Sequence, residues 1–371
     1  MPDFPDEEFE HRTIRAQQAM TKAGFDALFL TTEAEIRYFT GFRTLFWQSP
    51  TRPWMLVVPR SGKPVAVIPE IGAPLMAETW IDDIRTWPAP RPDDDGVSLA
   101  REALAGYDIV ATPMGPESTL RMPMLDFRRL GVSFRDASPL ILALRAIKSD
   151  AEIEAIAAIC AIASSGFADA GSLFHPGQSL REAFRDFRIA LLRGGADDVP
   201  YLVGGAGPEG YADVISPPSD TALQAGDVLM LDTGATRNGY FCDFDRNFAL
   251  EHASDTARRA YATLNRATEA ALNCARPGVT CAELWLVMRN VIGGSGNIGR
   301  YGHGLGMQLT EWPSLAAFET TPLSPGMVLT LEPSVATGPE TMMVQEENIV
   351  ITDGPPRLLT TRAAPELPVL T

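Results

Sequence analysis

Three carboxylates inside one short apolar hairpin constrain this chain more than any other feature. Residues 228–250, VLMLDTGATRNGYFCDFDRNFAL, read as two strands joined at Asn238-Gly239, a dipeptide typical of tight hairpins. Asp232 lies on the first strand. Asp243 and Asp245 are two residues apart on the second, so both point to one face. A two-residue turn would set Asp232 opposite Asp245, and a four-residue turn would set it opposite Asp243. Either register crowds like charges, which repel unless a cation joins them.

Further candidate metal ligands follow later in the chain. His303 lies among glycines in YGHGLGMQLTEWPS, and Glu332 is the single charge in VLTLEPSV. In VQEENIVIT, strand alternation sends one of Glu346 and Glu347 inward. Carboxylates with one imidazole favour Mn, Fe or Co, with Zn as an alternative, over thiolate-bound ions. Bridging carboxylates hold two such ions about 3.5–4 Å apart and lower the pKa of a shared water. The sequence therefore predicts a carboxylate-rich site for two metals.

Length, composition and charge restrict the class of protein. The 371 residues suffice for two domains, and 45% hydrophobic with 21% charged residues is ordinary for a soluble globular chain. No run approaches the roughly 18 apolar residues that span a bilayer, and the acidic N-terminus has no apolar signal core. Four cysteines form no CxxC pair. We therefore expect a cytoplasmic protein. The net charge of −16 disfavours nucleic acid and anionic membranes as partners.

The chain divides into two stretches of different pattern. Short apolar strands at 25–32, 53–70 and 108–115 predict a small α/β domain in the first, with a hairpin turning at Ser61-Gly62. The second has capping-box spacings at Ser149 and Glu152, Ser179 and Glu182, and Thr280 and Glu283, and a longer helix from about 254 to 275. Strand pairs at 228–250, 326–335 and 343–352 lie between them, which predicts an α+β domain with helices covering a curved sheet. The Gly- and Pro-rich residues 203–220 are expected to form a long loop near the mouth of the site.

Six motifs in order resemble the pita-bread metallohydrolase family, which includes prolidase, aminopeptidase P, methionine aminopeptidase and creatinase. The motifs are AEIRYFTGF (34–42), LRAIKSDAEI (144–153), DTGATRNGYFCD, GHG, LEP and EEN. The resemblance implies an α+β pita-bread catalytic domain at 147–371 and a smaller α/β creatinase-like domain at 1–146. It implies a homodimer and two divalent ions, manganese first, with Co, Fe or Zn as alternatives. The implied metal ligands are Asp232, Asp243, His303, Glu332 and Glu346.

Three positions depart from the prolidase pattern. Prolidases carry a histidine 17 residues before the first Asp ligand, where this chain has Ile215, and another seven residues after the ligand histidine, at Thr310. Their arginine two residues before the last Glu ligand falls at Val344. In the peptidases these residues bind the substrate carbonyl, stabilise the transition state or shuttle protons. We therefore expect hydrolysis of an amide or peptide C–N bond in a small molecule or dipeptide, but not standard Xaa-Pro peptidase activity. The departures favour a non-peptide amide.

Other acidic residues are candidates for proton transfer. Glu332 and Asp245 are the first choices, and Asp245 stands where the family commonly has threonine. The alternative for Asp245 is an ion pair with a nearby arginine. Glu311, beside Trp312, is a further catalytic candidate, with an ordinary loop carboxylate as the alternative.

Aromatic residues of the first domain are candidates for substrate binding. Trp47, Arg52 and Trp54 lie in FWQSPTRPW. In creatinase-like dimers this domain reaches the partner's active site, so these residues are expected either to shape a substrate pocket or to form a surface cluster at the dimer interface.

Two other functions fit the resemblance less well. A lyase of the dimethylsulfoniopropionate type is suggested by the EWP triplet at 311–313, but Gly234 stands where that lyase has an additional aspartate. Non-catalytic pita-bread proteins tend to lose ligands, whereas this chain keeps all five, which also argues against a metal-free creatinase-like hydrolase.

Overall fold

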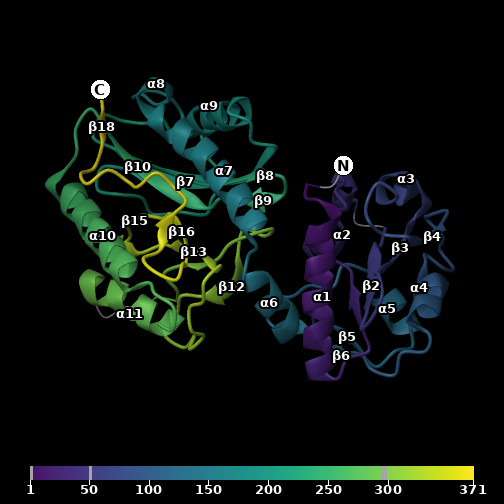
Figure 1. The fold of residues 1–371 in the computed structure, drawn as a ribbon. Coiled ribbons are helices and arrows are strands. Elements are labelled where there is room, and N and C mark those ends of the chain that lie inside the picture. The colour runs from purple at the N-terminus through teal and green to yellow at the C-terminus, as the bar shows by residue number, and fades with distance from the viewer. Residues whose placement is uncertain (1–2, 50–51, 294–298) are drawn as a thin grey trace. The chain divides into compact units, whose positions relative to one another are not determined.

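The computed structural model describes residues 3–49, 52–293 and 299–371. It divides the chain into two compact units, Met1–Arg145 and Ala146–Thr371 (Figure 1).

The first unit is a mixed six-stranded sheet in the order β4-β3-β2-β1-β5-β6. Strands β2 and β3 form the expected antiparallel hairpin, whereas β5 lies parallel to β1. The strands are β1 (Ala27–Leu30), β2 (Met55–Pro59), β3 (Val65–Pro69), β4 (Asp83–Trp87), β5 (Val110–Thr112) and β6 (Arg135–Asp136). The helices are α1 (Asp6–Ala23), α2 (Glu33–Thr40), α3 (Ala73–Met76), α4 (Val97–Leu104), α5 (Met124–Arg129) and α6 (Ser138–Ala146), with short 3₁₀ turns at Leu45–Gln48 and Glu70–Gly72.

The aromatic residues singled out in this unit are packed into its interior. Trp54 is 1% exposed, and its ring lies 5.6 Å from the ring of Trp47 and 5.3 Å from that of Phe42. The Arg52 guanidinium lies over the Phe46 ring at 4.9 Å. The two tryptophans therefore belong to a buried cluster, and the alternative of a surface cluster is wrong for them. Their role in substrate binding stays a prediction.

The helices of the second unit begin where the capping spacings predict. The side chains of Ser149, Ser179 and Thr280 each accept a hydrogen bond from the backbone N–H three residues on, and the glutamate there returns the bond. The helices are α7 (Asp150–Ala168), α8 (Ala170–Leu173), α9 (Leu180–Arg193), α10 (Asp255–Cys274) and α11 (Cys281–Ile292). Among the described helices, α7 alone is long and apolar enough to cross a membrane. In this structure α7 packs against the sheet of the second unit.

The carboxylate hairpin forms with the shorter of the two predicted turns. Asn238 and Gly239 both have positive φ, 49° and 66°, as a two-residue type I′ turn requires. Asp232 therefore pairs directly with Asp245. The sheet runs β18-β10-β8-β7, with β9 also paired to β8. Its strands are β7 (Asp198–Gly207), β8 (Val228–Arg237), β9 (Tyr240–Phe241), β10 (Phe244–Leu250) and β18 (Val369–Leu370).

The prediction of a loop at 203–220 is wrong for residues 203–207. Strand β7 continues to Gly207 and pairs with β8 along its length. A Cβ on Gly204 would lie 2.1 Å from the carbonyl oxygen of Met230. Gly204 permits the two strand backbones to approach each other closely. Glycine at this position therefore belongs to a strand and does not indicate a loop.

The two faces of this sheet have different roles. Phe244 and Phe248 of β10 pack on Phe167 of α7, with ring centroids 5.4 and 6.2 Å apart. On the opposite face, Met230 and Ala249 belong to one apolar cluster with residues of α10. Figure 1 shows α7 and α9 on one side of these strands and α10 and α11 on the other. Because side chains alternate along a strand, Asp232 and Asp245 lie on the face that α10 covers in part.

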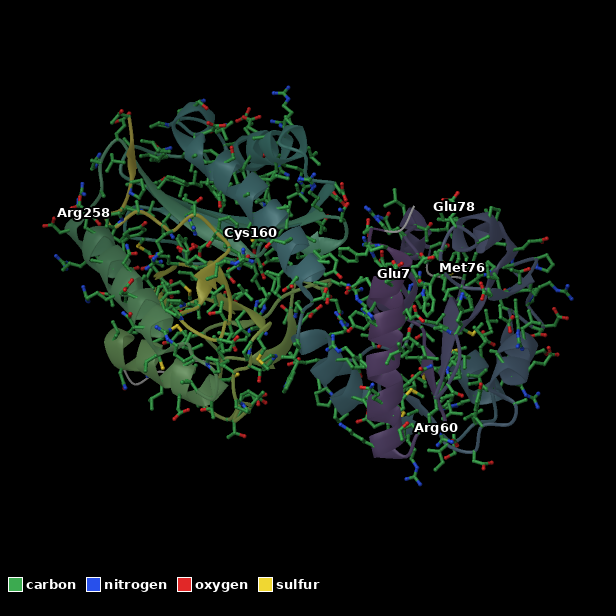
Figure 2. All side chains as sticks on the ribbon, in the orientation of Figure 1. Glu7, Arg60, Met76, Glu78, Cys160 and Arg258 are labelled. Atoms are coloured by element: carbon green, nitrogen blue, oxygen red, sulfur yellow. The ribbon has the colours of Figure 1, made fainter. Side chains whose placement is uncertain are left out.

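A second sheet, in the order β12-β11-β13-β16-β17, completes the unit. Leu329, Leu331 and Ile349 of this sheet pack against α10 and α11. In Figure 2 the labelled Cys160, a buried residue of α7, lies inside the unit, whereas Arg258 of α10 lies at its outer edge. The strands are β11 (His303–Gly304), β12 (Glu311–Ser314), β13 (Val328–Leu331), β16 (Glu347–Val350) and β17 (Arg357–Leu358), with a separate pair of β14 (Ser334–Ala336) and β15 (Met342–Val344).

Candidate metal centre

Three of the expected metal ligands converge on one point. Asp243, His303 and Glu346 are buried, and one ligand atom from each lies within 4.8 Å of the others. Nε2 of His303 is 3.4 Å from Oδ2 of Asp243. Asp243 lies between β9 and β10, His303 on β11, and Glu346 between β15 and β16. The two sheets of the unit therefore both contribute to the cluster.

Asp232 and Glu332 add two carboxylates to the same centre. Asp232 projects from β8, and Glu332 follows β13, where its N–H donates to the Tyr301 carbonyl at 3.0 Å. Burial, and next the charge of Glu332, raise the pKa of Asp232 to about 8. Burial and then the charges of Asp232 and Glu332 raise the pKa of Asp243 well above its usual range. All five expected ligands thus belong to one electrostatic cluster.

The donor set suits divalent cations. Oδ1 of Asp232 and Oε1 of Glu346 are buried without a hydrogen-bond partner among the described residues, and such oxygens are costly unless something satisfies them. Nδ1 of His303 lies 2.9 Å from the Gly304 carbonyl oxygen, an arrangement that orients Nε2 toward the cluster. Burial, with the charge of Arg300, lowers the pKa of His303 to about 4, so the imidazole is neutral at pH 7 and has a free lone pair. Oxygen donors with one neutral imidazole fit Mn, Fe, Co or Zn.

Asp245 is a further carboxylate in this cluster, in addition to the five expected ligands. It is 1% exposed, and its Oδ1 accepts from the Glu346 N–H at 3.3 Å. Burial, and next the charge of Asp232, raise its pKa. The neighbouring Arg246 donates instead to Glu347, at 2.8 Å. Within the described residues Asp245 has no ion pair with an arginine, so that alternative is wrong.

Glu311 is a buried residue with a cationic partner. It begins strand β12 and is 7% exposed, so the interpretation as an ordinary loop carboxylate is wrong. Its Oε2 accepts from Nζ of Lys148 at 3.0 Å, and its Oε1 accepts from the Gln308 N–H at 3.2 Å. Its carboxylate is therefore held between a lysine and its own loop, and its part in proton transfer stays a prediction.

Two residues that the sequence analysis did not single out lie beside the expected ligands. Asn348 holds the backbone of Asp243 from both sides, since its Oδ1 accepts from the Asp243 N–H at 3.0 Å and its Nδ2 donates to the Asp243 carbonyl. Asn348 is the third residue of the EEN motif, and this motif was the sequence signal that could have identified it. Tyr201 of β7 lies on the same face of the sheet as Asp232, since Tyr201 pairs with Gly234 and Val203 pairs with Asp232. It lies just before the stretch read as a loop, and no signal in the sequence placed it opposite β8.

The three departures from the prolidase pattern carry no imidazole or guanidinium into the site. Ile215 is 74% exposed, Thr310 is also exposed, and Val344 is buried among apolar residues.

An α/β unit followed by a unit whose two sheets bring Asp243, His303 and Glu346 together defines a two-domain pita-bread metallohydrolase. Residues 154–353 match Metallopeptidase family M24, and residues 12–147 match the Creatinase/Prolidase N-terminal domain. The chain belongs to metallopeptidase family M24.

Similar proteins agree in fold and in class. The chain is 28% identical over 339 residues to "Probable dipeptidase PepE" of Mycobacterium bovis, covering 90% of this chain and 89% of that protein. It is 29% identical over 260 residues to the Xaa-Pro dipeptidase of Pyrococcus furiosus, covering 67% and 73%. The crystal structure of dipeptidase PepE from Mycobacterium ulcerans superposes with a TM-score of 0.86 at 28% identity, covering 99% of both chains.

These findings confirm the resemblance and the fold. The protein is a hydrolase of the M24 family, a family of metal-dependent peptidases, and the lyase and non-catalytic alternatives are set aside.

Proposed function

We propose that the protein is a cytoplasmic, homodimeric, metal-dependent dipeptidase that hydrolyses the C–N bond of small peptides and is not a standard Xaa-Pro peptidase. The observation that carries this proposal is the buried cluster of Asp243, His303 and Glu346, combined with Ile215, Thr310 and Val344 at the three positions where prolidases have basic residues. The "Probable dipeptidase PepE" of Mycobacterium bovis, aligned over 90% of this chain, supports dipeptides as the substrate class.

The metal ligands in this proposal are Asp232, Asp243, His303, Glu332 and Glu346, which would hold two divalent ions. Manganese is our first choice, with Co, Fe or Zn as alternatives, because the donors are mostly hard oxygens. When bound, such ions lower the pKa of a water molecule and polarise the carbonyl of the scissile bond.

The acidic side chains would move the protons of the reaction. Asp232 and Glu332 are partly exposed, whereas Asp243 and Glu346 are buried, so the substrate would approach beside the first two. A carboxylate oxygen of Glu332 would accept a proton from the attacking water and deliver it to the leaving nitrogen as the C–N bond breaks. Asp245, opposite Asp232 and without an ion pair among the described residues, is the second candidate for this proton transfer.

The departures from the prolidase pattern would change which peptide binds. Without an imidazole at 215 or 310, or a guanidinium at 344, this site offers fewer cationic groups to a substrate carboxylate or to a developing oxyanion. The acidic cluster would therefore favour peptides whose groups near the metals are neutral or cationic.

Metal content followed by a substrate panel tests the proposal. Elemental mass spectrometry of the purified protein, before and after incubation with manganese, is expected to give about two equivalents per chain. A panel of Xaa-Pro dipeptides, other dipeptides and simple amides should then show the highest kcat/KM with a non-prolyl dipeptide. No metal uptake, or turnover confined to Xaa-Pro dipeptides, would contradict it.

A further inference from the structure

We infer that Arg246 is a positioning residue of the metal centre, whose guanidinium holds the main chain of Glu346 against strand β10. The segment 360–363 fixes that guanidinium through Glu347. The inference rests on the proposed function, because it takes Asp243 and Glu346 as metal ligands. Residues 360–363 lie outside every ligand motif and would thereby take part in metal binding.

The two sheets of the second unit bring metal ligands together without a strand ladder between them. Asp243 precedes β10, which pairs with β8 and β18, and Glu346 precedes β16, which pairs with β13 and β17. Among the described strands, none in the sheet that contains β10 pairs with one in the sheet that contains β16. The spacing between the two ligands therefore depends on side chains that cross from one sheet to the other. Asn348 is one of these side chains, and Arg246 is a second.

Arg246 crosses from β10 to the segment that carries Glu346. Its Nη1 donates to the carbonyl oxygen of Asp245 at 2.6 Å and to that of Glu346 at 2.8 Å. The side chain is 9% exposed, and its Cζ lies 4.7 Å from the ring centroid of Phe244. In the opposite direction, the Glu346 N–H donates to Oδ1 of Asp245 at 3.3 Å. Both main-chain polar groups of Glu346 are thus held by residues of β10.

The orientation of the Arg246 guanidinium is fixed by Glu347 and by a carbonyl group. Nη2 of Arg246 donates to Oε2 of Glu347 at 2.8 Å and to the Thr361 carbonyl oxygen. The two Nη groups carry four hydrogens, which matches the four acceptors in number. The Glu347 side chain is fully buried, and a planar guanidinium with these bonds cannot rotate without breaking several of them.

Three groups of the segment 360–363 supply the remaining donors to Glu347. They are Nη1 of Arg362 at 3.0 Å and the N–H of Ala363 at 2.8 Å, both to Oε1, and the hydroxyl of Thr360, to Oε2. Together with Arg246, four donors surround two carboxylate oxygens, which have about four lone-pair sites. A buried carboxylate whose sites are all occupied keeps one orientation, so this segment determines where Glu347 holds Arg246.

Main-chain support is important for Glu346 because one of its carboxylate oxygens has no other support. Oε1 of Glu346 is buried without a hydrogen-bond partner among the described residues. A ligand that is already in place binds a metal more tightly than one that has to be ordered when the ion arrives. Groups that orient metal ligands typically contribute about 10- to 100-fold in affinity. Loss of the Arg246 bridge would free the main chain at Glu346, so part of the binding free energy would be used to order it.

Calorimetric titration of manganese into Arg246→Met measures this support. We expect binding to be about 10- to 100-fold weaker than in the wild type, and Arg246→Lys, which keeps the charge, to recover part of the loss. The visible absorption spectrum of the Co(II)-loaded protein is a second readout, and it should change in Arg246→Met because it reports ligand geometry. Arg357→Met is the matched control and should match the wild type, since Arg357 lies on β17 of the same sheet as β16 and pairs with exposed Glu154.

Arg362→Met acts on the same bridge without contacting an expected ligand. The Arg362 side chain is 26% exposed, so this variant should fold even if Arg246→Met does not, and circular dichroism checks both. The substitution leaves one site on Glu347 without its donor. Manganese binding should weaken by about 3- to 10-fold, in line with the loss of one typical hydrogen bond.

The outcomes separate a positioning role from a purely structural one, because metal affinity of the folded protein does not depend on its stability. Wild-type manganese affinity and an unchanged Co(II) spectrum in folded Arg246→Met would overturn the inference. If Arg246→Met does not fold, wild-type manganese affinity in Arg362→Met would overturn it instead. A wild-type protein that binds manganese but cleaves no dipeptide would overturn the proposed function alone, since the affinity comparison needs no turnover. A wild-type protein that takes up no metal would overturn both.

Discussion

The buried ion pair between Lys148 and Glu311 offers a quantitative test of what holds the second unit together. Nζ of Lys148 lies 3.0 Å from Oε2 of Glu311, with the side chains 1% and 5% exposed. The substitution Lys148→Met keeps most of the side-chain volume but removes the Lys148 ammonium group from the buried carboxylate. Glu311 also accepts from the Gln308 N–H, so the loop between β11 and β12 depends on the same carboxylate.

The expected loss follows from the distance and the burial. At 3.0 Å and an effective dielectric constant of about 20, two unit charges attract by about 5.5 kcal/mol. Lys148→Met also relieves the cost of burying the ammonium group, and removal of one partner from a buried pair typically costs about 3–5 kcal/mol. At about 4 kcal/mol, and about 2–4 °C per kcal/mol for a unit of this size, the melting temperature should fall by roughly 8–16 °C.

Urea unfolding and calorimetry, at one fixed metal content, measure this effect. Lys148→Met combined with Glu311→Gln should lose less free energy of unfolding than the sum of the two single variants, because the pair is lost only once. The matched control is Arg181→Met, which removes an ion pair with Asp220 whose side chains are 56% and 80% exposed. That pair should contribute less than about 1 kcal/mol. A loss below about 1 kcal/mol for Lys148→Met would refute the reasoning.

Three further predictions concern the metal cluster. Asp243→Ala should abolish metal binding and turnover with little loss of fold, by elemental mass spectrometry, kinetics and circular dichroism; retained metal and activity would contradict the ligand assignment. Asn348→Ala should weaken manganese binding by about 10- to 100-fold in calorimetric titration, since Asn348 orients the Asp243 backbone, whereas exposed Asn273→Ala should not. In metal-free protein the raised pKa of Asp232, about 8 against about 3.9 unfolded, means that its proton stabilises the fold fully below pH 3.9. This contribution is lost as the pH rises to 8, so thermal melts should show the free energy of unfolding falling by at most about 1.4 kcal/mol per pH unit for this group, and saturating manganese should flatten the fall.

Features stabilised within a few residues could be predicted from the sequence. The capping boxes at Ser149, Ser179 and Thr280 form as their spacing predicts, since the donor and the acceptor are three residues apart. Asn238-Gly239 forms a tight turn because both residues tolerate positive φ. The order of the ligand motifs identified the family for the same reason, since each motif is itself a short local pattern.

Contacts between distant segments were decided by the tertiary structure. Lys148 and Glu311 are 163 residues apart, and no spacing rule pairs them. Arg246 donates to the carboxylate of Glu347, 101 residues away, and not to the carboxylate of its neighbour Asp245, because successive side chains of a strand point to opposite faces. Tyr201 shares a face of the sheet with Asp232 only because β7 pairs with β8 in one particular register. The sequence by itself determined which groups could bind metal, whereas packing of the two sheets decided which other side chains accompany them, since burial and charge depend on neighbours that are remote along the chain.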